Sequence, residues 1–164
     1  IYDRYKRLDI LVGNAAILGD LTPMPQLSPE VWDNVIRTNL TANWAMLRSF
    51  DSLLKQSVAG RVIFVTSTVG AKPRAYWSAY SVSKAGLEMM TKIYAAEQEK
   101  TDIKANLVNP GPTRTRMRSR AMPGEDESTV KPPEMVTEVF VRLAEETNLL
   151  NGSILDCDSQ GSSL

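Results

Sequence analysis

The sequence predicts an α/β fold in which helices cover both faces of a parallel sheet. Short apolar runs alternate along the chain with longer segments whose apolar residues recur at helical spacing, a pattern typical of βαβ units. Small or polar residues follow three of the apolar runs, as at the carboxyl edge of a parallel sheet. We therefore expect a three-layer αβα arrangement, formed as a single domain over residues 1–164.

Composition narrows the possible partners. Nineteen basic and nineteen acidic residues cancel, so we expect no nucleic-acid partner, and no apolar run approaches the roughly 18 residues that span a membrane. The single cysteine, Cys157, excludes an internal disulfide. Because histidine is also absent, we expect no metal site, and acid–base chemistry must come from tyrosine, lysine or carboxylates. The chain opens without a Met or a signal peptide, and we expect a cytoplasmic setting.

The elements follow from local patterns. The run Leu8–Gly13 predicts a strand that a glycine closes. Ser28 and Pro29 are typical of a helix N-cap and first helical position, and the helix is expected to end before Gly60. The remaining expectations, in order, are a strand at Arg61–Thr66, a helix from about Ala75 to Lys100, a strand at Ile103–Val108, an irregular or short helical lid from about Thr113 to Thr129, a helix from Pro132 to about Glu146, a strand at Gly152–Asp156, and a loose polar tail from Ser159.

The candidate site lies where three predicted strands end. These ends carry Asn14-Ala15-Ala16, Thr66-Ser67-Thr68 and Asn109-Pro110-Gly111, and parallel strands bring such ends to one edge. Tyr80 and Lys84 on the following helix share a face because they are four residues apart. A free tyrosine titrates near ~10, so a nearby ammonium that stabilises the phenolate would suit it to proton exchange. Tyr2 and Lys6 have the same spacing without a preceding strand-end serine, so the combination with Ser67 is the distinguishing feature.

At these residues the chain resembles the classical short-chain dehydrogenase/reductase family, and the resemblance covers about residues 8 to 157. It implies a Rossmann (doubly wound) fold and hydride transfer between NAD or NADP and a small carbonyl or secondary alcohol. The matching pieces are Asn14-Ala15-Ala16, Thr38-Asn39-Leu40, Ser67, Tyr80-x-x-x-Lys84, and Pro110-Gly111 with Thr115 four residues after the glycine.

The resemblance also implies residue roles. Tyr80 would exchange a proton with the substrate oxygen, Ser67 would hold that oxygen, and Asn39 would hold a water linking Lys84 to solvent. Lys84 would lower the pKa of Tyr80 and bind the nicotinamide ribose. The other implied cofactor contacts are Asn14, Ala15 and Ala16 on the adenosine side, and Pro110, Gly111, Thr113 and Thr115 along the nicotinamide and its phosphate.

Two departures qualify the match. Ala16 stands where the family commonly has glycine, and the family's glycine-rich first βα turn is not in the chain. We therefore expect a partial Rossmann fold, the catalytic half of a longer protein, whose first strand is an exposed edge. The residue that selects NAD over NADP would lie in the part before Ile1. The resemblance further implies a homodimer or homotetramer, suggested by the apolar excess of Trp44, Met46, Leu47 and Phe50.

Other interpretations remain for each motif. Tyr80 and Lys84 could be a surface pair, Ser67 a loop cap, Asn39 a helix-bending residue, and Asn14 and Pro110-Gly111 turn residues only. Arg114, Arg116, Arg118 and Arg120 could form a solvated face, or attract an anionic substrate or a carrier phosphate. The alternative functions are a catalytically inactive truncated fragment and a non-catalytic nucleotide-sensing domain, and epimerase or dehydratase chemistry is a more distant one.

Overall fold

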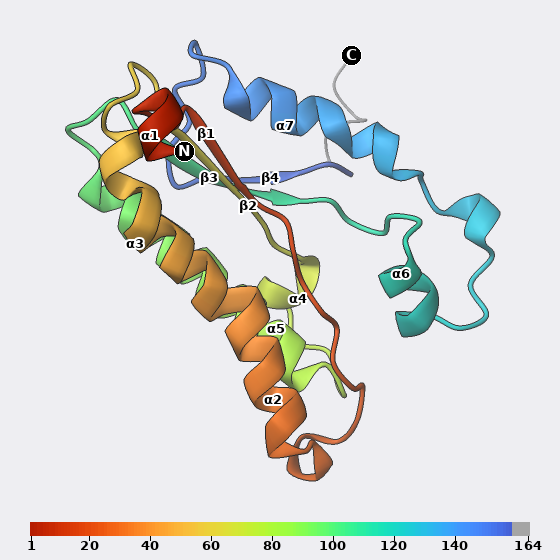
Figure 1. Cartoon of the computed structure of the whole chain (residues 1–164). Helices are drawn as coiled ribbons and strands as arrows, with labels where there is room; N and C mark the ends of the chain where they lie inside the picture. Colours follow the sequence, from red (N-terminus) through yellow and green to blue (C-terminus); the bar gives the residue numbers. More distant parts are fainter. Residues whose placement is uncertain (159–164) are drawn as a thin grey trace.

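The computed structural model describes residues 1–158, so the tail predicted from Ser159 lies outside the described residues. Within them, four parallel strands form one sheet in the order β1-β2-β3-β4 (Figure 1). The strands are β1 (Ile10–Gly13), β2 (Arg61–Val65), β3 (Lys104–Asn109) and β4 (Ile154–Asp156). Each predicted strand is present, and its ends differ from the expectation by no more than two residues.

The helices also follow the predicted order, with additions that are too short for a helical period to reveal. The α-helices are α1 (Tyr2–Tyr5), α2 (Pro29–Ile36), α3 (Ala42–Leu54), α4 (Thr68–Ala71), α5 (Ser78–Glu97), α6 (Arg116–Ala121) and α7 (Thr137–Ala144). A π-helical segment, η2 (Arg37–Thr41), joins α2 to α3, and single 3₁₀ turns form η1 (Met24–Gln26), η3 (Glu127–Thr129) and η4 (Pro133–Val136). The sequence did not predict α1 or α4.

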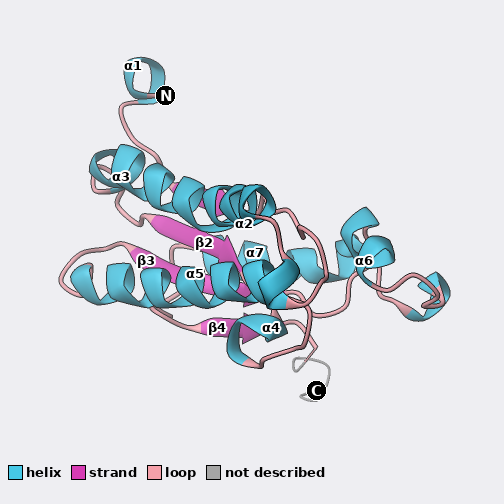
Figure 2. Cartoon of the chain, turned by 90° about the horizontal axis from the view of Figure 1, so that it is seen from below, coloured by secondary structure: helices cyan, strands magenta, loops and turns pink. Residues whose placement is uncertain are grey.

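Helices cover the two faces of the sheet, which confirms the predicted three layers. Helices α3 and α5 lie on one face and α7 on the other (Figures 1 and 2). Alternate residues of β2 supply both cores, since Phe64 packs toward α3 and α5 while Ile63 packs toward α7. All five β2 residues are buried, as expected for a central strand of a parallel sheet.

Strand β1 is the edge of this sheet, and only one of its faces is covered. Leu11 is buried in the core beneath α3, whereas Ile10 and Val12, which point to the opposite face, are 44% and 45% exposed. Within residues 1–158, β1 pairs with β2 alone. The predicted exposed edge strand is therefore present, with two apolar side chains open to solvent.

A buried arginine joins the ends of several elements at the amino edge of the sheet. The guanidinium of Arg61 donates hydrogen bonds to the backbone carbonyls of Gly60, Asp102, Glu145 and Glu146, at 2.8 to 3.1 Å. Burial lowers the pKa of Arg61 from its ordinary value. These bonds satisfy carbonyls that follow α7 and precede β2 and β3, so one side chain fixes three connections.

Candidate active site

Tyr80 and Lys84 lie on the buried side of α5, facing the carboxyl end of β2. Their exposed fractions are 8% and 3%. The Lys84 Nζ donates a 2.7 Å hydrogen bond to the Val65 carbonyl and lies 5.6 Å from the centre of the Tyr80 ring. The four-residue spacing therefore produces a buried pair, and the alternative of an ordinary surface pair is wrong.

Ser67 follows β2 and faces Tyr80. A side-chain hydrogen bond joins Ser67 to Tyr80, and Ser67 makes no side-chain capping bond although it is the N-cap residue of α4. The serine at the strand end and the tyrosine on the helix are thus brought together. Ser67 is therefore not a plain helix cap, because its hydroxyl is directed to Tyr80.

The pKa values in the pair differ from the expectation. Burial raises the pKa of Tyr80 above its ordinary value, and the hydrogen bond to Ser67 is a smaller, opposing effect. Burial also lowers the pKa of Lys84 to about 8. The resemblance implied that Lys84 would lower the pKa of Tyr80. Here burial dominates, and the ammonium is engaged with the Val65 carbonyl instead of the phenol oxygen.

Asn39 is fully buried in the π-helical segment η2. Its amide forms a reciprocal pair with the backbone of Ile17, accepting from the Ile17 N–H and donating to the Ile17 carbonyl, both at 2.9 Å. Its second N–H donates to the Ser83 hydroxyl at 3.0 Å, and Ser83 donates to the Tyr80 carbonyl at 2.7 Å. Both N–H donors of the side chain are thereby used on protein groups. These contacts give Asn39 a positioning role between the loop after β1 and α5, and its expected water-holding role stays a prediction.

Glu88 was not predicted, although it continues the same helical face. It lies four residues after Lys84, and the Thr66 hydroxyl donates a 2.6 Å hydrogen bond to its carboxylate. This buried contact ties α5 to the residue before Ser67. The repeated four-residue spacing from Tyr80 was the signal that could have identified it.

The residues expected along the cofactor fall into two groups. Asn14 and Ala15 are exposed after β1, and Ala16 is half-buried beside them. Gly111 follows β3 with φ of 65°, in the left-handed region that favours glycine, and its open side faces the Asp158 carboxylate. Pro110 precedes it in the same turn.

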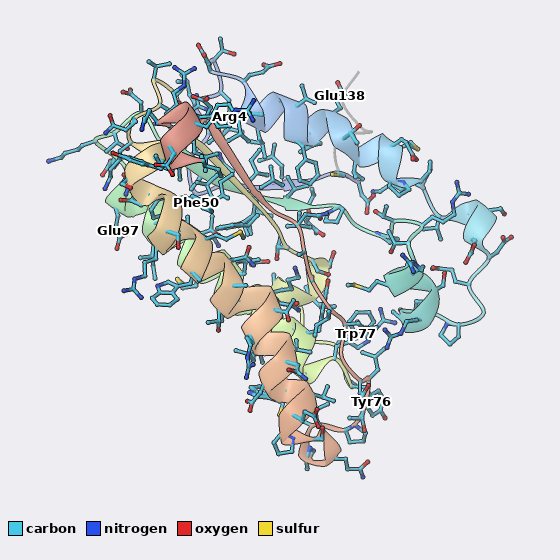
Figure 3. All side chains as sticks on the ribbon, in the orientation of Figure 1. Arg4, Phe50, Tyr76, Trp77, Glu97 and Glu138 are labelled. Atoms are coloured by element: carbon cyan, nitrogen blue, oxygen red, sulfur yellow. The ribbon has the colours of Figure 1, made fainter. Side chains whose placement is uncertain are left out.

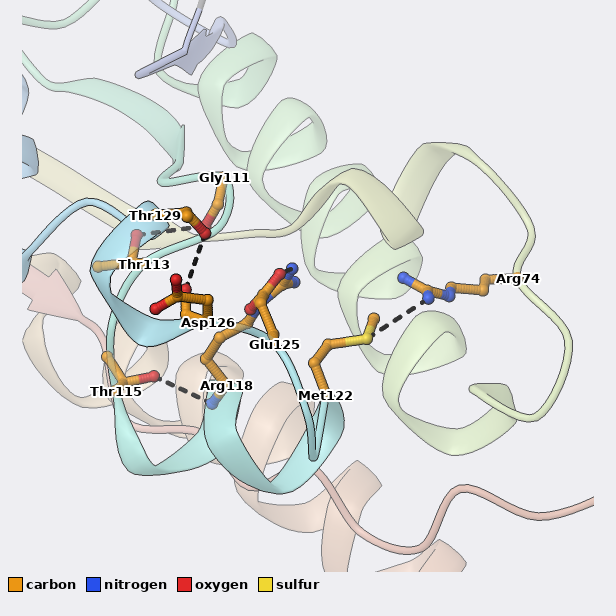
Figure 4. A network of polar contacts seen from close by, with 9 residues as sticks. All are labelled: Arg74, Gly111, Thr113, Thr115, Arg118, Met122, Glu125, Asp126 and Thr129. Atoms are coloured by element: carbon orange, nitrogen blue, oxygen red, sulfur yellow. Dashed lines mark hydrogen bonds and ion pairs between the residues drawn. The ribbon is translucent and has the colours of Figure 1, made fainter.

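Thr113 and Thr115 use their hydroxyls within the loop after β3. Thr113 donates to the Gly111 carbonyl at 3.2 Å, and Thr115 is the N-cap of α6, accepting from the Arg118 N–H at 3.2 Å (Figure 4). The structure therefore brings both threonines to the carboxyl edge of the sheet, where they order the start of the lid.

A line of side chains connects the lid to Tyr80. The Trp77 ring lies edge-on to Tyr80, with centroids 5.9 Å apart, and the Arg74 guanidinium lies 5.0 Å from the Trp77 ring centre. Arg74 also points to the lid, with its Nη2 3.7 Å from the Met122 sulfur (Figure 4). Tyr76 and Trp77 lie at the end of the molecule near the start of α2 (Figure 3). Tyr76 has φ of 73°, which is rare for a bulky residue and marks a constrained turn before α5.

The four arginines of the lid have different environments. Arg118 forms a two-point ion pair with Glu125, with its Nε 2.6 Å from one carboxylate oxygen, and this pair lowers the pKa of Glu125 (Figure 4). Arg114, Arg116 and Arg120 are exposed. The interpretation of a solvated face therefore fits Arg114, Arg116 and Arg120, whereas Arg118 is paired with Glu125 within the lid.

A cavity of about 570 Å³ separates α6 from the loop after β1. Ala16, Ile17 and Met117 contribute to its apolar wall, and none of Ser67, Tyr80 and Lys84 is among its lining residues. Helix α6 lies beyond the ends of the strands (Figure 2), at the edge of the sheet that carries Ser67. Ile17, which lines the cavity, is joined through Asn39 and Ser83 to the backbone carbonyl of Tyr80.

The parallel sheet, its two helical layers and the polar residues at its carboxyl edge define a Rossmann-type α/β domain. A sequence profile of the short chain dehydrogenases matches residues 1–126. The chain belongs to the short-chain dehydrogenase/reductase family. No helix within residues 1–158 combines the length and apolar character needed to cross a membrane.

Individual relatives agree in sequence and in structure. The oxidoreductase YciK of Escherichia coli K12 is 38% identical over 139 residues, which are 85% of this chain and 55% of YciK. The 3-oxoacyl-[acyl-carrier-protein] reductase FabG of Thermotoga maritima is 29% identical over 96% of this chain and 68% of its own. A short chain dehydrogenase from Shigella flexneri, complexed with NADP, superposes with a TM-score of 0.92 at 35% identity, covering 96% of this chain and 66% of that one. The chain thus spans between about half and two thirds of the length of these relatives.

Proposed function

We propose that this chain is the catalytic half of an oxidoreductase that transfers a hydride between NAD or NADP and a small carbonyl or secondary-alcohol substrate, with Tyr80 as the acid/base. The observation that carries the proposal is the hydrogen bond between Ser67 and the buried Tyr80, with Lys84 on the same helical face. Two family members support the cofactor assignment: one structure contains NADP, and another, from Escherichia coli CFT073, contains NADPH.

The side chains at this site fit a nicotinamide cofactor. The Lys84 ammonium has three N–H donors, and within residues 1–158 the Val65 carbonyl takes one. Two donors are left for ribose hydroxyls in a position that is 3% exposed, where an unfilled donor is costly. Asn14, Ala15 and Ala16, together with the turn at Pro110 and Gly111, would flank the rest of the cofactor at this edge.

In the direction of reduction, a bound nicotinamide cofactor would supply a hydride to the carbonyl carbon. Ser67 donates a hydrogen bond to the carbonyl oxygen and holds it against the phenol. Tyr80 then gives its proton to that oxygen, so that two electrons and two hydrogens convert the carbonyl to an alcohol. Because burial raises the pKa of Tyr80, the phenol carries the proton that reduction requires.

Substitution of Tyr80 tests this role. In the complete protein, Tyr80→Phe removes the exchangeable proton while keeping the ring against Trp77, so we expect turnover to fall by about a hundredfold or more. Cofactor affinity should change little, because the Lys84 ammonium remains. Turnover is followed by the absorbance of reduced nicotinamide and affinity by its fluorescence. A Tyr80→Phe protein that turns over normally would exclude Tyr80 as the acid/base.

A second proposal concerns the activity of residues 1–164 taken alone. We propose that they form a single incomplete domain that lacks a segment covering the exposed Ile10 and Val12, and that this piece is catalytically inactive by itself. The uncovered face of β1 favours this proposal, because apolar side chains at a sheet edge usually meet a partner. No feature of the described residues favours a nucleotide-sensing role over catalysis.

We also propose a homodimer or homotetramer for the complete protein. An apolar groove of about 450 Å³ runs between η2 and α5, and Trp44, Met89 and Ile93 on its walls are 50% to 59% exposed. Of the four residues that suggested oligomerisation, Trp44 alone belongs to this surface. Met46 and Phe50 are half-buried and Leu47 is buried in the core.

A further inference from the structure

The cavity between the loop after β1 and the lid has a distinctive division of chemistry. The loop and α2 supply most of an apolar wall, and α6 supplies two guanidinium groups, Arg116 and Arg120. These arginines are four residues apart, so they lie on one side of α6. The cavity is therefore apolar on one side and cationic on the other. Its full apolar wall consists of Ala16, Ile17, Leu18, Val31, Val35 and Met117.

The positive charge at this cavity is not neutralised inside the protein. Arg118, between the two arginines in sequence, is paired with Glu125, whereas neither Arg116 nor Arg120 has a carboxylate partner in the part of the chain that the structure describes. The cavity lining contains one carboxylate, Asp20, on the loop side. Two cations against one anion leave the cavity with a net positive charge.

We propose that this cavity binds the far end of the substrate, and that this end is an apolar chain terminated by an anionic group held by Arg116 and Arg120. The proposal rests on the proposed oxidoreductase function, because it assigns the reacting carbonyl to the Ser67–Tyr80 site. The apolar wall accommodates the chain, and guanidinium groups bind carboxylates and phosphates with two parallel hydrogen bonds. The connection runs through Ile17, which lines the cavity and is tied by Asn39 and Ser83 to Tyr80.

Matched ligands distinguish the contribution of the anionic group to affinity from that of the apolar part of the ligand. The probes are methyl-ketone acids with two to six methylene groups before the carboxylate, each compared with its neutral methyl ester, and pantetheine 4′-phosphate as the phosphate-bearing competitor. Binding is measured by calorimetry on the complete protein carrying Tyr80→Phe, so that turnover does not interfere. We expect acids to bind about five- to tenfold more tightly than their esters, since the arginines are exposed and solvent screens them.

Variants then assign the effect to the two arginines. Arg116→Gln with Arg120→Gln should abolish the difference between acid and ester, and the corresponding double Lys variant should restore part of it. Asp20→Asn should strengthen acid binding by removing a repulsion. Arg114→Gln is the control, because Arg114 is exposed on the same segment but does not line the cavity. Far-ultraviolet circular dichroism checks that each variant is folded.

Each outcome decides between the proposals. Competition by pantetheine 4′-phosphate that depends on both arginines would identify a carrier-type phosphate as the anion, whereas discrimination limited to the acids would identify a free carboxylate. Equal binding of acid and ester, or a loss of NADPH affinity in place of acid affinity, would overturn the inference. Arginine-dependent acid binding without any turnover by the protein with Tyr80 intact would instead count against the oxidoreductase function alone.

Discussion

The buried amine of Lys84 makes stability depend on pH in a defined direction. Burial lowers its pKa from 10.5 to about 8, so between these values the unfolded chain holds a proton that the folded chain has released. The free energy of unfolding therefore rises with pH across this window, by about 3 kcal/mol in total at about 1.4 kcal/mol per pKa unit. The raised pKa of Tyr80 acts in the opposite direction above pH ~10, where only the unfolded phenol has lost its proton.

The prediction is that Lys84→Met removes this rise. At pH 7 the free energy of unfolding of the Lys84→Met variant should exceed that of the original protein. This difference should shrink steadily between pH 8 and 10. Denaturant titrations at each pH measure it. Lys92→Met is the matched control, since it removes an ammonium from the exposed face of the same helix. A Lys84→Met difference that stays constant over this interval would contradict the prediction.

The residues of the Tyr80 site were predicted from spacing, but their couplings were not. Tyr80, Lys84 and Ser67 could be identified because a four-residue interval and a strand end are readable in a sequence. The reciprocal pairing of Asn39 with Ile17 spans 22 positions, and it depends on a π-helical segment that no hydrophobic period encodes. The direction of the Tyr80 pKa shift depends on burial, which requires the packed fold.

Elements of the sheet are held in register by polar contacts as well as by apolar packing. Arg61 at the start of β2 satisfies four backbone carbonyls from three connections, and its side chain is 3% exposed. Its replacement would remove the donor to the Asp102 and Glu146 carbonyls, whereas the Gly60 and Glu145 carbonyls also accept from backbone N–H groups. Such groups cost about 1–3 kcal/mol each when a buried partner is lost, although water reaches some of them.

We expect Arg61→Met to reduce the free energy of unfolding by about 2–4 kcal/mol while leaving the strand order intact. Methionine has a similar length, so the change tests the hydrogen bonds more than the volume. Urea denaturation followed by tryptophan fluorescence measures the loss. Arg48→Met, on the exposed side of α3, should change stability by less than about 0.5 kcal/mol. Equal effects of the two substitutions would show that the carbonyl contacts contribute little.

Element boundaries illustrate what a sequence pattern can specify. Ser28 caps α2 as predicted, accepting from the Val31 N–H, because the cap is a local contact. The lid was predicted as irregular or short-helical, without bounds for a helix, and its helix α6 depends on Thr115 and on the pairing of Arg118 with Glu125 across seven residues. Contacts of that range are set by the folded loop, so apolar periodicity does not report them.

The whole molecule presents an uncovered sheet edge, and its relatives are longer than this chain. The chain spans 55% of YciK and 66% of the Shigella flexneri structure, and Ile10 and Val12 are open to solvent beside β1. We predict that residues 1–164 alone bind NADPH at least about a hundredfold more weakly than the complete protein, because a phosphate cradle at a helix N-terminus is an expected part of the binding site. Calorimetric titration of both forms tests this, and equally tight binding by residues 1–164 would refute it.

The proposed oligomerisation of the complete protein can also be tested at this scale. Trp44, Met89 and Ile93 form an exposed apolar groove on the side of the molecule away from the sheet. Trp44→Glu should shift the complete protein toward monomers in sedimentation velocity, because a buried unpaired charge is costly at an apolar interface. Arg37→Glu is the comparison, because Arg37 is exposed in the adjoining segment η2 and does not line the groove. A sedimentation coefficient unaffected by Trp44→Glu would place the interface elsewhere.

The three-layer arrangement was predictable because alternation of strands and helices leaves few topologies for one chain. The exposure of one face of β1 was less predictable. Ile10 and Val12 have the apolar character of core residues, and only the folded sheet reveals that their side is uncovered.

The side-chain amide of Asn39 pairs with Ile17 as a neighbouring strand would, because it bonds both the backbone N–H and the backbone carbonyl of that residue. The loop that follows is held at its start by this contact and at its end by the Ser28 cap of α2. Leu18 between these anchors is buried, but exposed residues such as Met24 could be exchanged without shifting the chemistry at Tyr80. Such modularity would let one scaffold acquire new substrates by grafting a loop.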